Sequence, residues 1–112
     1  MSEDNRKEIF SLLALSRRAG VLQIGQDAAK MMLRRGERAV LFIAEDCSAN
    51  VLRMFKGYEE RGQCRIVDFP AKREDMMTFL GVATQIVALP ERHGLTLKIE
   101  SLLRGKGGRL HE

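Results

Sequence analysis

The stretch RAVLFIAED, residues 38–46, constrains the fold of this chain more than any other feature. It is a nearly continuous run of apolar, mostly branched residues that ends in two carboxylates. A strand with one face in water alternates apolar and polar side chains, whereas a strand covered on both faces is apolar along its length. We therefore expect residues 38–46 to form a central strand in a sheet with a layer of structure on each face.

Helical and extended patterns alternate along the rest of the chain. Apolar residues at helical spacing, with capping residues and glycines at the ends, predict five helices. Branched apolar runs predict the strands, which number four if LQI, residues 22–24 within the extended piece 21–24, forms one. We expect helices between Asp4 and Gly20, over 26–35, between Ser48 and Gly62, over 72–80 and around Leu95, Ile99 and Leu102, and strands over 21–24, 38–46, 64–69 and 84–90. This alternation predicts a sheet between two layers of helices.

The length of 112 residues fits one domain with its own core. We assign residues 1–104 to that domain and 105–112 to a flexible basic tail. The longest apolar runs fall far short of the roughly 18 residues that a membrane-spanning helix needs. The first ten residues are polar and acidic, unlike a secretory signal, so we expect a cytoplasmic protein without a membrane partner.

Charge alone leaves the partner open. Nineteen Lys and Arg residues against fifteen Asp and Glu give a formal net charge of +4, which permits a nucleic-acid partner without requiring one. The aromatic content is 5% with no tryptophan, so we do not expect base-stacking platforms of the kind that single-strand binders use.

Positive charge gathers in residues 16–36, SRRAGVLQIGQDAAKMMLRRG. Such a cluster is either a solvated helix surface or a surface that binds a polyanion. Gly25 stands where the second helix begins, and the backbone amides of a helix start favour phosphate. This glycine favours the polyanion interpretation for Arg17, Arg18, Lys30 and Arg34.

Cys47 and Arg53 suggest an enzymatic alternative. A cysteine and an arginine separated by five residues after a strand are the skeleton of cysteine phosphatases, in which a thiolate attacks phosphorus and the arginine holds the oxyanion. The intervening residues lack the glycines that a phosphate cradle needs. We therefore rank a phosphatase below a binding protein.

The remaining motifs carry little chemistry. Glu45 and Asp46 follow the central strand, where a carboxylate pair either binds a metal or accepts a phosphoryl group, or more commonly favours the start of the next helix. Cys47 and Cys64 have no second pair and no histidine at a ligand spacing. We expect no metal and no cofactor.

The segments LLALSRRAGVLQIG and LRRGERAVLFIAEDCS resemble the L-seven-Ae ribosomal protein family, which includes the eukaryotic L-thirty-e ribosomal protein and the small bacterial YlxQ-type proteins. The resemblance covers residues 6–103. It implies an α/β fold, a three-layer α-β-α sandwich with a four-stranded mixed sheet.

The resemblance also implies binding of kink-turn or related bulged RNA, through the start of the second helix and the loop before the last strand. In RNA-binding members an Asn-Glu pair follows the glycine of that helix, and a lysine stands three residues beyond the Glu. The matching positions here hold Asp27, Ala28 and Met31, so the base-reading set is replaced. The loop corresponds to residues 81–84, where Val82 and Ala83 would pack against an extruded nucleotide.

We therefore predict a non-enzymatic RNA-binding protein of ribosomal-protein type, with structured ribosomal or translation-related RNA as its partner and no small-molecule substrate. The alternative is a protein-interaction or scaffold module that has kept the fold and lost the RNA site. The predicted RNA-binding residues are Arg17, Arg18, Gly25, Gln26, Asp27, Lys30, Arg34, Val82 and Ala83.

Overall fold

The computed structural model describes residues 2–105 and contains one four-stranded sheet in that range. Its order is β1-β4-β2-β3, with β2 parallel to β3 and antiparallel to β4, and β1 antiparallel to β4. The strands are β1 (Gln23–Ile24), β2 (Ala39–Ile43), β3 (Cys64–Asp68) and β4 (Ile86–Pro90). The expected mixed sheet is thus confirmed.

Strand β2 is the central strand that its sequence predicts. All five of its residues are at most 4% exposed. Val40 and Phe42 belong to the core on one face of the sheet, and Ala39, Leu41 and Ile43 belong to the core on the other face. Alternate side chains of one strand therefore supply both cores.

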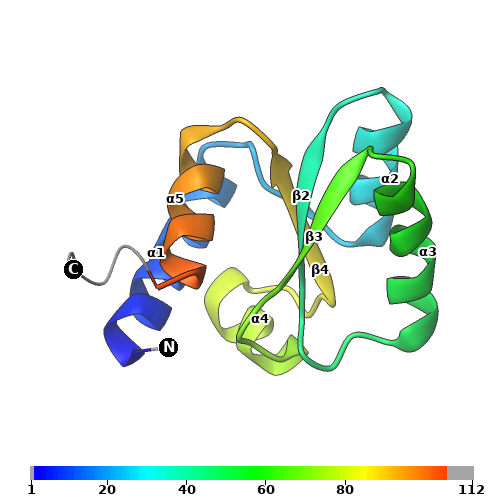
Figure 1. The fold of residues 1–112 in the computed structure, drawn as a ribbon. Helices are drawn as coiled ribbons and strands as arrows, with labels where there is room; N and C mark the ends of the chain where they lie inside the picture. The colour runs from blue at the N-terminus through cyan, green and yellow to red at the C-terminus, as the bar shows by residue number, and fades with distance from the viewer. Residues whose placement is uncertain (1, 106–112) are drawn as a thin grey trace.

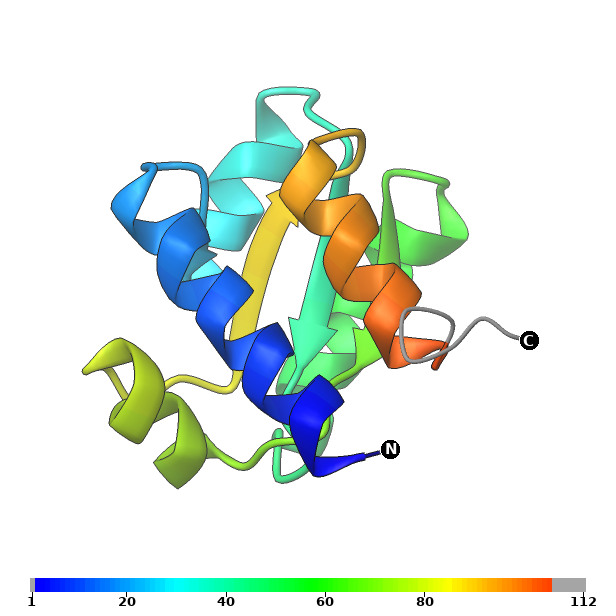
Figure 2. The same cartoon turned by 90° about the vertical axis from the view of Figure 1, so that its left-hand side faces the viewer.

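Two layers of helices cover the two faces (Figure 1). The first and last helices cover one face and α2 and α3 cover the other, while the short α4 packs at one end of the first layer (Figures 1 and 2). The helices are α1 (Glu3–Arg18), α2 (Gln26–Arg34), α3 (Ala49–Glu60), α4 (Arg73–Leu80) and α5 (Gly94–Leu103). This arrangement is the expected three-layer α-β-α sandwich.

The predicted start of α1 is wrong by a few residues. The Ser2 hydroxyl, not Asp4, caps the helix by accepting a hydrogen bond from the Asn5 N–H at 3.1 Å. Asp4 lies instead in the first turn, where the helix dipole favours a negatively charged side chain. Serine and aspartate are both good caps, so local sequence does not choose between them.

A buried carboxylate ties β3 to α5. Glu100 is 6% exposed and accepts hydrogen bonds from Arg65 Nε at 3.1 Å and Arg65 Nη2 at 2.9 Å. These bonds raise the pKa of Arg65, against the desolvation that lowers it. Two guanidinium nitrogens of Arg65 thus bind the two oxygens of the Glu100 carboxylate, whose negative charge would be costly to bury without a partner.

The C-terminal tail and membrane-spanning helices were the subject of two expectations from the sequence. The proposed tail at 105–112 falls, apart from Gly105, outside the described residues. No helix within residues 2–105 has the length and apolar character needed to cross a bilayer.

The core on the α2/α3 face gives a stability prediction. Phe55 is 0% exposed, so Phe55→Ala leaves a cavity and should lower the free energy of unfolding by about 3–5 kcal/mol. Leu97→Ala is the control, because Leu97 is 53% exposed and should lose less than about 1 kcal/mol. Urea unfolding followed by circular dichroism measures both, and equal losses would contradict this assignment of the core.

Candidate nucleic-acid interface

The start of α2 and the loop before β4 meet at one end of the sheet. Antiparallel pairing aligns Ile24 with Val87, so the next residue, Gly25, faces the first residue of β4. The Gly25 N–H donates to the Ile86 carbonyl at 3.0 Å. The register of β1 against β4 therefore places residues 81–84 beside the beginning of α2, and this joins two segments that are far apart in the sequence.

Gly25 has a backbone conformation that other residues rarely adopt. Its φ is 93° and its ψ is 163°, and the α2 start that it caps has no side-chain hydrogen bond. A Cβ at Gly25 would meet nothing within 4 Å. The glycine is thus needed for its dihedral angles, not because neighbours crowd it, and the space beside it is open.

The loop before β4 is anchored at its base. The Thr84 hydroxyl donates to the Ile86 carbonyl at 2.8 Å, and Thr84 is 7% exposed. The next residue, Gln85, accepts from the Ser48 N–H at 2.7 Å and so ties the loop to the start of α3. Val82 is partly exposed and Ala83 is exposed. The loop therefore presents two small apolar side chains on a fixed base.

Arg17 reaches this loop from α1. Its Nη1 lies 3.7 Å from the position that a Cβ at Gly81 would occupy. Arg18 is exposed in the same last turn of α1. Over residues 2–105, Arg17, Arg18 and Arg34 form no ion pair.

Several other cations have their charge offset by a carboxylate. Their partners lie within 4.0 Å, so these cations are less available to a phosphate. The paired cations are Arg6, Lys30, Arg35, Arg38, Arg65, Arg73 and Lys98.

The predicted α2 residues lie either in the first two turns of the helix, as Gln26, Asp27 and Lys30 do, or at its end, as Arg34 does. Gln26 and Asp27 are exposed in the first turn, and the Asp27 side chain is 96% exposed. Lys30 follows one turn later, with its Nζ 4.0 Å from Asp27 Oδ1. Arg34 ends the helix, about 13–14 Å from Gly25 at the 1.5 Å rise per residue. Among the predicted RNA-binding residues, the structure thus places all except Arg34 near the loop at 81–84 or near the start of α2. Arg18 belongs to this set through its position next to Arg17.

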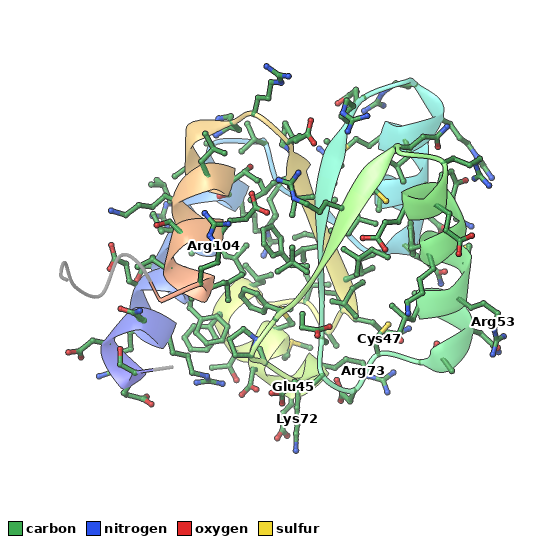
Figure 3. The ribbon with its side chains drawn as sticks, in the orientation of Figure 1. Glu45, Cys47, Arg53, Lys72, Arg73 and Arg104 are labelled. Carbon is green, nitrogen blue, oxygen red and sulfur yellow. The ribbon has the colours of Figure 1, made fainter. Side chains whose placement is uncertain are left out.

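Cys47 and Arg53 are not brought together. The Cys47 thiol donates to the Ser48 carbonyl at 3.5 Å, and burial raises the pKa of this thiol although the Arg73 guanidinium lowers it. Arg53 donates instead to Asn50 Oδ1 at 3.0 Å and projects outward from α3, away from Cys47 (Figure 3). A phosphatase needs a low-pKa thiolate and a facing arginine, and this pair provides neither.

Asp46, the second carboxylate after β2, has a structural use. Asp46 Oδ1 accepts from the Arg73 N–H at 2.9 Å, and Oδ2 lies 3.5 Å from Arg73 Nε. Desolvation raises the pKa of Asp46, but the Arg73 hydrogen bonds and charge outweigh it and lower the pKa below its ordinary value. Asp46 thus serves the start of α4 instead of α3. No group of three metal-ligating side chains occurs in the described part of the chain.

Two residues near the interface escaped the sequence analysis. The sequence places Gln85 in the predicted strand at 84–90, and nothing in its spacing indicates a bond to Ser48. Phe79 lies in α4 two residues before the loop and is 41% exposed. A phenylalanine in an amphipathic segment normally indicates core, so its exposure has no signal in the local sequence.

Comparison with known proteins supports the fold. A protein of unknown function from Bacillus halodurans superimposes with a TM-score of 0.72 at 18% identity, covering 86% of this chain and 96% of its own. The 15.5-kDa RNA-binding protein of Giardia lamblia superimposes with a TM-score of 0.63 at 17% identity, covering 95% of this chain and 89% of its own. No family model and no curated protein sequence matches the chain. At these identities the likeness shows a shared fold.

The environment of Cys47 gives a reactivity prediction. Its raised pKa should make alkylation by iodoacetamide at pH 7.5 slower than that of free cysteine, with a rate that still increases above the ordinary thiol pKa of about 8.5. Mass spectrometry of a Cys64→Ser variant isolates this rate, because the substitution removes the other thiol of the chain. In the unaltered protein Cys64 should contribute little, since it is buried and its pKa is raised to about 11. Fast alkylation that is independent of pH between 6 and 8 would instead indicate a reactive thiolate.

Proposed function

We propose that this protein binds structured RNA through the start of α2 and the loop at 81–84, as a non-enzymatic member of the L-seven-Ae and L-thirty-e ribosomal protein family. One observation carries the proposal. The open space at Gly25, the anchored loop before β4 and the guanidinium of Arg17, which has no ion-pair partner within residues 2–105, lie together at one end of the sheet. The shared fold of a Giardia lamblia protein named for RNA binding supports it.

Each part of this surface has a role that suits RNA. Arg17, Arg18 and Lys30 would neutralise phosphates, and the exposed Gln26 amide would hydrogen-bond base or sugar edges. Val82 and Ala83 would pack against a nucleotide that leaves the helix stack. Arg34, at the far end of α2, would contribute to a longer RNA backbone path.

The RNA class follows from what the surface lacks. Asp27, Ala28 and Met31 replace the residues that read sheared G·A pairs in the family, so recognition would rest on shape and phosphates more than on base edges. A bulged or kink-turn-like RNA, of the ribosome or another translation-related particle, is the proposed partner in the cytoplasm.

Removal of two cations near the helix start should change the salt dependence of binding. Arg17→Ala with Lys30→Ala should weaken binding of a bulged RNA hairpin and flatten its plot of log affinity against log salt by about one unit for each phosphate that is no longer neutralised. Lys56→Ala with Arg61→Ala removes the same charge from the region of α3 and is the control. Equal flattening by both pairs would indicate bulk charge and not this surface.

Restoring the family residues should restore base reading. Asp27→Asn, Ala28→Glu and Met31→Lys alter exposed or partly exposed positions, so the triple variant should fold normally. We expect it to bind a kink-turn RNA at least about tenfold more tightly than the unaltered protein, as one good base contact contributes roughly 1–3 kcal/mol. The same RNA with its G·A pairs replaced by Watson–Crick pairs is the control, and an equal gain for both RNAs would contradict the proposed docking edge.

A second candidate is a protein-interaction module, which the outer edge of β3 favours because no strand within residues 2–105 pairs with it. A groove of about 830 Å³ runs along this edge between the start of α3 and the end of α5. Failure of the protein to bind any structured RNA at low salt would favour this role. Hydrolysis of an aryl phosphate, abolished by Cys47→Ser, would instead revive the phosphatase alternative.

A further inference from the structure

Strand β3 forms the edge of the sheet opposite to β1, and part of its backbone lacks hydrogen bonds. The Phe69 N–H donates to the Ile43 carbonyl of β2 at 2.9 Å. Since backbone directions alternate along a strand, the groups of Ile66 and Asp68 point away from β2. Glu59 of α3 accepts from the outward Ile66 N–H at 2.8 Å. The Ile66 carbonyl and both backbone groups of Asp68 have no partner within residues 2–105, so they are available to an added strand.

The groove of about 830 Å³ follows this open stretch and has an apolar half on each side of β3. On the α3 side it is lined by Leu52 and Ile66, which pack against the core beneath α2 and α3. On the α5 side it is lined by Val67 and Leu103, which pack against the other core. All four side chains are only partly buried. Consecutive side chains of a strand point to opposite faces, so a strand laid along this edge would place one side chain in each half.

Charged side chains at the groove determine which partner fits it. Asp68 lies on the same face of β3 as Ile66, the α3 side, and Glu45 also lines the groove. Both carboxylates are exposed and form no ion pair within residues 2–105. The Arg65 guanidinium is already bound by two carboxylates, and Arg104 lies on the α5 side of β3 (Figure 3). The α3 side is therefore acidic and favours a basic side chain beside an apolar one.

We propose that the β3 edge binds an extended peptide segment of a partner protein as an added antiparallel strand. A basic residue of the peptide would lie opposite Asp68, and apolar residues would lie opposite Val67 and Ile66. Asp68 would exchange two backbone hydrogen bonds with the basic residue, and the Ile66 carbonyl would accept a third. The inference rests on the second candidate function and gives it a partner of defined chemistry. It does not require RNA binding, because β1, which leads into the RNA interface, forms the opposite edge of the sheet.

The probe is a fluorescein-labelled peptide of sequence Thr-Lys-Val-Val-Thr-Ser with blocked ends. Aligned antiparallel to β3, its lysine lies opposite Asp68 and its valines lie opposite Val67 and Ile66. Fluorescence anisotropy measures affinity, and hydrogen exchange followed by NMR measures protection of the Asp68 N–H. We expect saturable binding and slower exchange at Asp68, since its N–H gains a hydrogen bond.

Two N-methylated peptides distinguish strand pairing from general apolar contact. Methylation of the lysine backbone nitrogen removes a donor that faces β3, and it should weaken binding by about tenfold or more. Methylation of the first valine removes an N–H that points away from β3, so this peptide is the matched control and should bind like the parent. Equal losses for both peptides would overturn the proposed strand geometry.

Charge reversal tests the acidic side of the groove. Asp68→Lys should weaken binding by at least about threefold, and a peptide with glutamate in place of lysine should restore it. Glu60→Lys alters an exposed carboxylate at the far end of α3 and should leave binding unchanged. Circular dichroism verifies that both variants are folded. Equal effects of the two variants would indicate bulk charge and overturn the pairing with Asp68.

Other occupants of the groove would give different results. Absence of peptide binding by the unaltered protein would overturn the inference. Self-association that competes with the peptide, measured by analytical ultracentrifugation, would overturn it in favour of a second copy of the chain. A large gain in peptide affinity in Leu110→Ser would overturn it in favour of the chain's own C-terminal segment. Failure to bind structured RNA at low salt would reject the RNA interface alone, because the two sites are measured with different ligands.

Discussion

Burial of β2 on both faces is the constraint on which the rest of the structure depends. A five-residue strand with every side chain buried must have helices above and below it and a strand on each side. Strands β3 and β4 supply the two neighbours, one parallel and one antiparallel. With β4 fixed in this way, β1 pairs with the remaining edge of β4, and this pairing carries Gly25 to the loop at 81–84.

The distribution of charge follows from packing as well as from composition. Carboxylates that stabilise the fold also offset neighbouring cations: Glu100 binds Arg65, and Asp46 binds Arg73 at the start of α4. Arg17 and Arg18 keep their charge at the end of α1, where the helix dipole favours a cation. Arg17 thus brings a cation without an ion-pair partner in residues 2–105 to the loop at 81–84.

Much of the fold could be predicted because local patterns and tertiary contacts agree. Ser48 caps α3 as expected, and Ala29, Met32 and Leu33 form the buried face of α2 that their spacing predicts. Two details differ from the prediction, for different reasons. Ser2 replaces Asp4 as the cap of α1, because both residue types cap well and local sequence does not choose between them. Asp46 serves α4 instead of α3, because the backbone N–H nearest to it in space belongs to Arg73, which is distant in sequence.

By itself, the sequence determined the layered α/β architecture, since the periods of apolar residues fix which face of each element must be buried. It also determined that Gly25 begins α2, since only glycine readily adopts its positive φ. Tertiary structure alone decided that Arg17 meets the loop at 81–84, that Cys47 and Arg53 stand apart, and that Phe79 remains half exposed on Phe10. These outcomes depend on how α1 and α4 pack and on the register of β1 with β4, and such long-range geometry leaves no trace in local spacing.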